Sequence, residues 1–131
     1  MAKIITAAEA ADLIRDGMTL GVSGFGAFAS PDCVMEAMSR KFKEQNTPRD
    51  LTIVSGVAPG DFVEDGCGLS KIKDEGIIRT LIASHLRMSP AIGRACSENK
   101  IAAFSMPLGV YGQLMNAIGG KRPGIITHVG L

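Results

Sequence analysis

The architecture of this chain follows from the segment Thr19-Leu20-Gly21-Val22-Ser23-Gly24-Phe25-Gly26-Ala27-Phe28-Ala29-Ser30-Pro31. Its apolar start, Thr19–Val22, predicts a short buried strand. A loop with closely spaced glycines follows, and Ser30-Pro31 is typical of a helix N-cap and first helical position. Such a unit brings free backbone N–H groups and the positive end of a helix dipole to one point, which attracts a phosphate, a carboxylate or a developing oxyanion. The alternative is a tight turn that only packs the helix on the strand.

Short apolar runs alternate with helical patterns along the rest of the chain. Further strands are expected at residues 51–54, 77–83 and 101–106. Helices are expected at residues 6–16, 31–43, 90–98 and 110–118, with a short one at 69–73. Strands that alternate with helices favour parallel βαβ units. The predicted fold class is therefore α/β: an open, mostly parallel sheet with helices on both faces, in a single domain of 131 residues.

Local signals mark the ends of these helices. Thr6 and Glu9 form a capping box at the start of the first helix, and Gly17 is expected as the left-handed residue after its end. Ser89-Pro90 is expected to begin the third helix, and Asn99 to follow its end. The second helix has an apolar face that should pack on the core: Val34, Met35, Met38 and Phe42.

The composition excludes several classes of function. The formal net charge is +1, 5% of the residues are aromatic and tryptophan is absent, so no basic or base-stacking surface for nucleic acid is expected. No apolar run approaches the roughly 18 residues of a membrane span, and the N-terminus shows no signal-peptide pattern. We therefore expect a cytoplasmic protein that binds neither nucleic acid nor membrane.

The cysteines and acidic residues give no catalytic or metal-binding pattern. Cys33, Cys67 and Cys96 lack C-x-x-C spacing, which favours a reducing compartment. The first and last fall in expected helices, where we expect them to be buried, whereas Cys67 lies in a glycine-rich loop. We expect no metal, because the acids of that loop do not follow the pattern of a calcium loop and are interpreted as solvated. These acids are Asp61, Glu64 and Asp65.

Several flexible segments follow directly after the expected strands. In an open parallel sheet, ligands bind outside the carboxyl ends of the strands. The loops on that edge are expected at residues 23–30, 55–68, 84–89 and 107–109. His85 lies just after a strand there, and it could bind a ligand, act as an acid or base, or serve as a hydrogen-bonded structural histidine. Ser23 lacks the G-x-S-x-G pattern of a nucleophile elbow, which disfavours a hydrolase.

An ordered set of segments resembles one enzyme family over nearly the whole chain. Residues 22–31 resemble a V-G-G-F-G-x-x-G-x-P loop, and Pro107-Leu108-Gly109-Val110 resembles a P-Q-G-V segment. Further matching segments follow in order at residues 5–11, 16–17, 48–53, 75–77, 85–90, 99–103 and 123–131. The set is similar to the N-terminal part of a family I coenzyme A transferase, of the propionate, short-chain acyl-CoA:acetate or 3-oxoacid type.

This resemblance implies a chemistry for the glycine loop. In the family, a glutamate attacks an acyl-CoA to form a mixed anhydride, which CoA converts into a glutamyl-CoA thioester that reacts with a carboxylic acid. Each addition passes through an oxyanion that needs preorganised N–H donors. By resemblance, the substrate- and oxyanion-binding residues are Gly24, Phe25, Gly26, Ala27, His85, Leu108 and Gly109.

The resemblance also implies which parts of the active site lie elsewhere. Residues 1–131 match the N-terminal part of the α half, and we expect them to be truncated at the C-terminus. The nucleophilic glutamate belongs to the C-terminal half, so this chain is expected to hold no catalytic residue and to be inactive alone. Ser97-Glu98-Asn99-Lys100 mimics the family's S-E-N-G context, but it falls at a helix end, and we exclude Glu98 as the nucleophile.

The implied fold is the superfold that these transferases share with sugar-phosphate isomerases. Coenzyme A is the implied co-substrate, with no metal or redox cofactor. The implied partners are an acyl-CoA, a short-chain carboxylic acid, the C-terminal half or β subunit of the transferase, and further copies in a homo-oligomer.

The chain departs from the family pattern at a few positions. Ser23 and Ala29 replace glycines of the first loop, and Leu108 stands where a glutamine is usual. Leu86 and Arg87 replace an aromatic residue and a glycine. These departures leave open a second function, a non-enzymatic domain of the same superfold that binds acyl-CoA or a sugar phosphate. A Rossmann nucleotide domain is disfavoured because G-x-G-x-x-G is lacking.

Overall fold

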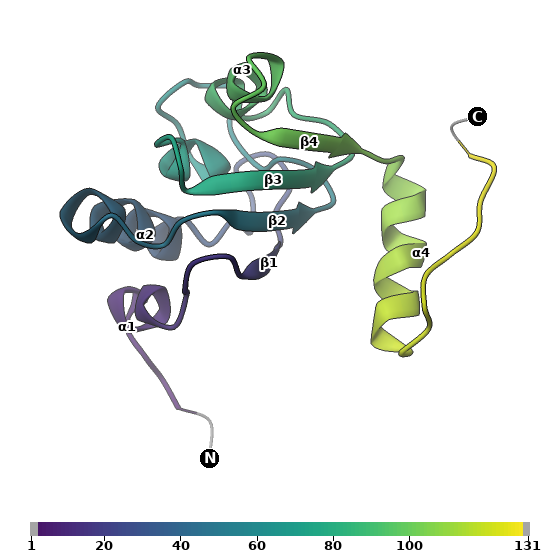
Figure 1. Ribbon diagram of the computed structural model, residues 1–131, viewed down its shortest axis with the longest axis horizontal. Helices are drawn as coiled ribbons and strands as arrows, with labels where there is room; N and C mark the ends of the chain where they lie inside the picture. Colours follow the sequence, from purple (N-terminus) through teal and green to yellow (C-terminus); the bar gives the residue numbers. More distant parts are fainter. Residues whose placement is uncertain (1–2, 130–131) are drawn as a thin grey trace.

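The structure, a computed structural model, describes residues 3–129 (Figure 1). Its elements are α1 (Ala7–Asp12), β1 (Thr19–Val22), α2 (Asp32–Gln45), β2 (Leu51–Ser55), the 3₁₀-helix η1 (Gly68–Ile72), β3 (Ile78–Ala83), α3 (Pro90–Ser97), β4 (Ala102–Ser105) and α4 (Leu108–Gly119). Every expected strand forms, and its ends differ from the expected ones by at most one residue. The expected helices also form, although α1 is shorter than its pattern indicates.

The strands form one four-stranded parallel sheet in the order β1-β2-β3-β4. One row of paired residues across the sheet is Gly21, Val54, Ile82 and Phe104. The neighbouring row is Leu20, Ile53, Leu81 and Ala103. Because side chains alternate along a strand, these two rows lie on opposite faces. The predicted α/β fold with an open parallel sheet is confirmed.

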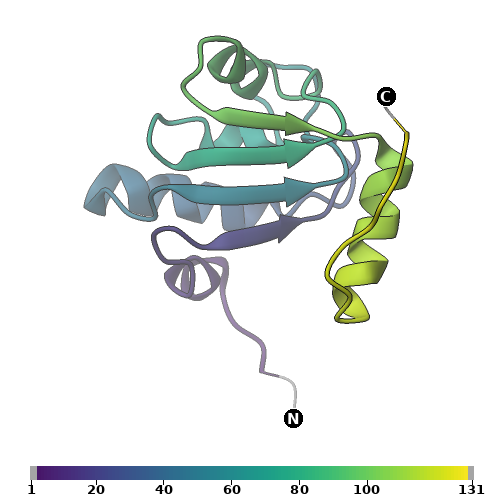
Figure 2. The ribbon, with the colours of Figure 1, turned by 45° about the vertical axis from the view of Figure 1, so that its right-hand side comes forward.

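The helices that connect the strands cover one face of this sheet. Right-handed crossovers between successive parallel strands, all taken in the same direction, place every connection on the same side. Figure 2 accordingly shows α2 behind the sheet, with α1 below β1. Contacts join α1 to α2, and η1 to both α2 and α3. We expected helices on both faces of the sheet. Within residues 3–129, the connecting helices cover one face only.

The hydrophobic core lies between the sheet and these helices. Its wholly buried side chains include Leu51, Ile53, Leu69, Leu81 and Ile92. Met35 and Met38 of α2 are buried against them, and Val34 and Phe42 pack partly, so the expected apolar face of α2 is confirmed. Burying a side chain of this size contributes roughly 1.5–3 kcal/mol. The core thereby fixes the strands whose carboxyl ends carry the candidate site.

The first helix begins where the sequence predicts and ends early. The Glu9 N–H donates to Thr6 Oγ1 at 3.2 Å and the Thr6 N–H donates to Glu9 Oε2 at 2.8 Å, which confirms the capping box. The helix stops at Leu13, in place of the predicted stop at Gly17. Gly17 has a φ of +72° in the turn before β1, where its N–H donates to Arg49 O at 2.8 Å. This glycine therefore joins two turns and does not cap the helix.

Both predicted serine caps are used differently in the structure. Pro31 occupies the N-cap position of α2 without a side-chain hydrogen bond, so Ser30 lies in the loop. Ser89 does precede α3, but its hydroxyl donates to Pro59 O at 2.7 Å and caps no helical N–H. At Ser89 this tertiary contact outweighs local capping. Asn99, with a φ of +58°, does follow the end of α3 as predicted.

The cysteines differ in exposure from the prediction. Cys33 is exposed, because it lies about 200° around α2 from the buried Met35 at 100° per residue. Cys96 and Cys67 are half-buried, and burial raises the pKa of both thiols, assisted at Cys67 by the charge of Asp61. Among the described residues, no helix is both long and apolar enough to cross a membrane.

Candidate functional site

Four loops leave the sheet at the carboxyl ends of its strands. They follow β1, β2, β3 and β4, and because the strands are parallel they meet along one edge. Figures 1 and 2 show the arrowheads side by side, with α4 standing beyond them. The sequence-derived site residues all lie on these loops or at the start of α4. The structure thus brings them to one edge, as the strand pattern predicts.

The loop after β2 is the centre that joins its neighbours. The Gly60 N–H donates to Gly26 O at 3.0 Å, which ties this loop to the glycine loop after β1. The Ala58 N–H donates to His85 O, and the Ser84 N–H donates to Gly56 O, both at 3.0 Å. These bonds hold the segment after β3 as well. Because three loops share one backbone network, the edge has a defined shape.

Close packing explains why the loop after β2 is rich in small residues. A Cβ at Gly60 would lie 2.2 Å from Met88 O and 2.5 Å from Ser89 Oγ, closer than real Cβ atoms approach. Ser89 is fully buried and donates to Pro59 O. Sequence reasoning missed Gly60, Met88 and Ser89 as organisers of the edge. Only the serine had a signal, and the pattern assigned it to a cap.

The glycine loop is a tight turn with two of its four candidate N–H donors free. Phe25 and Phe28 exchange backbone hydrogen bonds of 3.1 Å in each direction, so the Phe25 N–H is already paired. The Gly26 N–H donates to the Met88 sulfur at 3.3 Å. Within residues 3–129, the N–H groups of Gly24 and Ala27 have no hydrogen-bond acceptor. Gly24 and Ala27 are therefore the two of these four residues whose N–H groups stay unpaired in the described part of the chain.

The loop needs its glycines for both conformation and space. Gly24 has a φ of +132° and Gly26 a φ of +60°. A Cβ at Gly24 would also lie 3.1 Å from the Pro59 Cβ. Residues 23–31 contain no charged side chain, so nothing in the loop itself competes electrostatically for a bound anion. Phe25 and Phe28 are 60% and 82% exposed beside these donors.

His85 and Leu108 approach the edge from β3 and β4. The His85 ring is exposed and makes no hydrogen bond with residues 3–129, so the hydrogen-bonded structural role is not observed. Leu108 begins α4 and is 51% exposed. Its Cδ1 lies 3.2 Å from the position a Cβ would take at Gly56, and the Tyr111 ring lies 3.5 Å from it. Leu108 and Tyr111 thus form an apolar wall above the end of β2, while Gly109 faces open space.

Two hydroxyl groups at this edge are buried without a partner. Ser30 Oγ ends the glycine loop and Ser84 Oγ follows β3, and neither makes a hydrogen bond in the described part of the chain. A buried polar atom is normally paired with protein, water or ligand. The edge therefore holds unused hydrogen-bonding capacity.

Glu98 lies at the opposite edge of the sheet. It ends α3 just before β4 and pairs with Lys100 at 3.1 Å. Together with Glu75, at 3.7 Å from the same ammonium group, it raises the pKa of Lys100. This position supports its exclusion as the nucleophile, because the glycine loop is at the other end of the strands.

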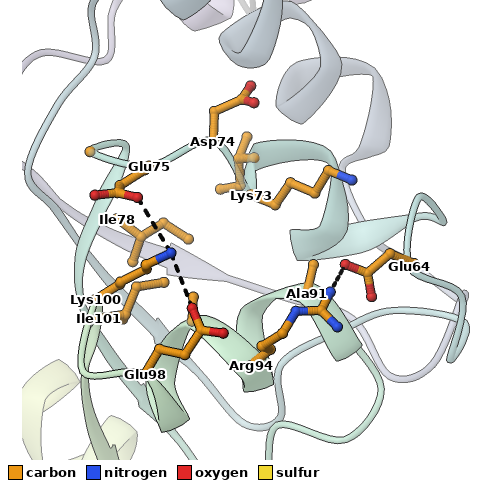
Figure 3. A pocket seen from close by; sticks show the side chains of 13 residues that line it. Glu64, Lys73, Asp74, Glu75, Ile78, Ala91, Arg94, Glu98, Lys100 and Ile101 are labelled. Atoms are coloured by element: carbon orange, nitrogen blue, oxygen red, sulfur yellow. Dashed lines mark hydrogen bonds and ion pairs between the residues drawn. The ribbon is translucent and has the colours of Figure 1, made fainter.

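A hollow of about 310 Å³ at that opposite edge carries many charges (Figure 3). Figure 3 shows Lys100 between Glu75 and Glu98, and Arg94 paired with Glu64. Asp65 forms a further ion pair with Lys73. Glu64 and Asp65 thus pair with cations of the protein. Among the described residues, no group of three or more histidine, cysteine or acidic side chains is placed to hold a metal ion.

The amino-acid sequence of this chain is similar to those of known proteins. The profile of the coenzyme A transferase family matches residues 4–131. The chain is 40% identical to a caffeate CoA-transferase of Acetobacterium woodii, over all of this chain and 25% of that protein. It is 33% identical to the acetate CoA-transferase YdiF of Escherichia coli K12, over 98% of this chain and 24% of that protein. The chain therefore spans about a quarter of the length of these relatives.

Solved structures agree with this comparison. The apoenzyme of the acyl-CoA transferase YdiF of E. coli O157:H7 superposes with a TM-score of 0.89 at 33% identity, over 98% of this chain and 25% of that chain. A thioester complex of the same transferase with CoA gives a TM-score of 0.88, over 97% of this chain and 26% of that chain. The chain is also 29% identical to the acetate CoA-transferase subunit alpha of E. coli K12, over 98% of this chain and 54% of that subunit.

Proposed function

Because this chain belongs to the coenzyme A transferase family, we propose that it forms the N-terminal part of the α half of an enzyme that transfers CoA between an acyl-CoA and a carboxylic acid. The match of residues 4–131 to the family carries this proposal. Relatives of two kinds support a partner for the chain: long single proteins of which it spans a quarter, and alpha subunits of which it spans about half. The proposed partner is a C-terminal half or β subunit.

The proposed reaction proceeds through the partner's glutamate. Its carboxylate oxygen attacks the thioester carbonyl of the acyl-CoA, and the CoA thiolate leaves as a mixed anhydride forms. The thiolate then attacks the glutamyl carbonyl, which releases the acyl group as a carboxylate and leaves a glutamyl-CoA thioester. A second carboxylic acid reverses these steps and departs as the new acyl-CoA. No metal or redox cofactor takes part in this sequence.

In these reaction steps, the chain supplies hydrogen-bond donors to the oxyanions. The N–H groups of Gly24 and Ala27 have no acceptor among residues 3–129 and lie in a turn braced by the Phe25–Phe28 backbone pair. Preorganised donors of this kind stabilise charge as it develops, and the loss of one typically costs about 10²–10³ in rate. The uncharged loop and its exposed phenylalanines favour a site of low dielectric once the partner covers it.

The other site residues are proposed to bind the substrate. The exposed His85 ring can donate a hydrogen bond from a ring N–H to a carbonyl or carboxylate oxygen of the substrate. Leu108 and Tyr111 offer an apolar wall to the acyl group, and Gly109 leaves room beside them. The proposed acids are short-chain carboxylic acids, and the name of the caffeate relative makes caffeate the aromatic acid to test beside them.

The test is CoA transfer by the complete protein, with any separate subunit that supplies the second half. Propionyl-CoA is mixed with acetate or caffeate, and new acyl-CoA is measured by liquid chromatography. Without an acceptor acid, intact mass should rise by one CoA less one water, on a glutamate outside this chain. If no acid in the panel accepts CoA and no such adduct forms, the transferase proposal fails.

The departures from the family pattern favour one alternative function. Ala29 has a φ of +56° where the family pattern has glycine, so a strained loop is retained despite the substitution. A domain that binds acyl-CoA without turnover would tolerate this change together with Leu108. Saturable acyl-CoA binding by the complete protein, with neither transfer nor adduct, is the result that supports this alternative.

A further inference from the structure

The Met88 side chain reaches from the segment after β3 to the glycine loop after β1. The Gly26 N–H donates to its sulfur at 3.3 Å, in a part-buried position. Met88 is only 7% exposed, and its own backbone oxygen accepts the Phe62 N–H at 2.9 Å. The residue is therefore anchored to the loop after β2 while its side chain touches the loop that carries the candidate donors.

Met88 and Gly60 hold the two polar groups of Gly26. The sulfur accepts its N–H, and the Gly60 N–H donates to its carbonyl at 3.0 Å. A trans peptide is planar, with its C=O and N–H pointing in opposite directions. Because the Gly26 carbonyl is directed toward Gly60, the N–H of the same peptide, which belongs to Ala27, is directed away from that loop. The Ala27 donor is therefore aimed by contacts made on Gly26.

The chemistry of the thioether suits this arrangement. Sulfur in methionine is a weak acceptor, so it satisfies the Gly26 N–H in a site where a stronger acceptor, such as a carboxylate, would bring charge beside the developing oxyanion. Other buried methionines, including Met35 and Met38, accept no such bond among residues 3–129. Met18 also accepts a backbone N–H, from Arg15 at 3.4 Å, but it lies exposed in the turn before β1, so Met88 is the buried methionine that makes such a bond among residues 3–129.

We propose that Met88 is a positioning residue, whose sulfur acts with the Gly60 N–H to hold Gly26, so that the Ala27 N–H of the next peptide points at the substrate oxyanion. The effect of Met88 on catalysis rests on the proposed transferase function. Its contact with the glycine loop is independent of that function. Met88→Leu removes the acceptor at nearly constant volume, a change that cores tolerate well. Met35→Leu makes the same chemical change in the core and is the matched control.

Both variants are compared with wild type in the complete protein by hydrogen exchange and by transfer kinetics. Mass spectrometry follows the peptide that covers residues 23–31. For Met88→Leu we expect exchange of this peptide to quicken about fivefold, as for the loss of one modest hydrogen bond. We expect kcat to fall about 3- to 30-fold, less than for loss of a whole donor, with KM for acyl-CoA nearly unchanged. Met35→Leu should change neither the exchange rate of this peptide nor kcat.

A second variant separates the bond from the packing. Met88→Gln puts an amide oxygen at similar reach, and it should return exchange of the loop peptide toward the wild-type rate. The proposal is overturned if Met88→Leu leaves exchange and kcat at wild-type values, or if it changes KM alone. If wild type transfers no CoA, the proposed function and the catalytic role fall together, and the exchange rates still decide whether Met88 holds the loop.

Discussion

Gly60 shows how one missing side chain lets three loops meet. Its backbone N–H reaches Gly26 only because its α-carbon lies against Met88 O and Ser89 Oγ, where a Cβ would approach to 2.2 and 2.5 Å. One of these neighbours is backbone, so it cannot rotate out of the way. The placement of the glycine loop thus depends on a residue in another loop.

Gly60→Ala should therefore disturb both stability and activity. We expect the loops to be forced apart, with a loss of roughly 1–3 kcal/mol in the free energy of unfolding and a clear fall in kcat. Gly93→Ala in α3 is the control, since its Cβ would meet only ordinary contacts at 3.6 Å or more and helical alanine is favoured over glycine. Thermal unfolding and transfer rates of the complete protein provide the measurement. Equal melting temperatures for wild type and Gly60→Ala would contradict the packing argument.

For the exposed His85 ring we expect a loss of activity without a loss of stability. Because this ring makes no hydrogen bond within the described residues, His85→Ala should leave the melting temperature unchanged. If the ring binds a charged substrate oxygen, kcat/KM should fall about 10- to 100-fold. His128→Ala is the matched control. Unchanged kcat/KM in His85→Ala, measured with acyl-CoA and acid each varied, would remove His85 from the site.

At the scale of elements, the turns before β1 and β2 are joined through one carboxylate. Asp16 Oδ1 accepts the Thr47 hydroxyl at 2.7 Å and the Arg49 N–H at 2.8 Å. These hydrogen bonds lower the pKa of Asp16, with the Thr47 bond the larger cause. They favour the charged form, so the carboxylate helps to hold the amino ends of the two strands in register.

A lowered carboxyl pKa makes this contribution depend on pH. It is present above the unfolded pKa of Asp, about 3.9, and it is lost as pH falls through the lower folded value. Asp16→Asn should therefore destabilise the protein near neutral pH and bring its stability closer to wild type as pH falls below about 4. Urea unfolding between neutral and acidic pH measures this convergence. A gap that stays constant with pH would show that the charge contributes nothing.

In this chain, sequence patterns predict the positions of the strands and helices better than they predict the residues that cap the helices. The strand at β1 and the apolar face of α2 depend on local periodicity, which a core of leucine, isoleucine and methionine satisfies directly. Local patterns also predict Ser30 and Ser89 as caps, yet Ser30 lies one residue before the N-cap and the Ser89 hydroxyl donates to Pro59 O in another loop. Membership of a helix alone does not predict burial: Cys33 lies on α2 but on the side opposite the buried Met35, and it is exposed.

At the scale of the molecule, the strand order predicts where the candidate site lies but not how it is built. Parallel strands alone bring the four loops to one edge. The bonds that shape this edge join residues far apart in sequence, such as Gly26 to Met88, and no local pattern announces them. The family resemblance indicates the backbone from Gly24 to Ala27 as a whole, and only the tertiary contacts distinguish the unpaired N–H groups of Gly24 and Ala27 from the paired ones of Phe25 and Gly26.

The second face of the sheet and α4 determine how residues 1–131 should behave when separated from a partner. The row Gly21, Val54, Ile82 and Phe104 lies on the face opposite the core, with Phe104 60% exposed. Helix α4 is apolar along much of its length, yet Ala117 is its one buried residue. Apolar surface of this extent commonly marks an interface. We propose that the C-terminal half or β subunit covers it in the assembled enzyme.

The isolated chain is therefore expected to self-associate, to bind an apolar dye and to transfer no CoA. Phe104→Thr should weaken both self-association and dye binding, because it removes the largest exposed side chain of the row and keeps a residue suited to a strand. Ile4→Thr is the control, since Ile4 is exposed singly near the N-terminus, where one apolar side chain is ordinary. Light scattering and dye fluorescence compare the three proteins. A monomeric, dye-free wild type would mean that this face needs no cover, whereas transfer by the chain alone would mean that its own residues supply the nucleophile.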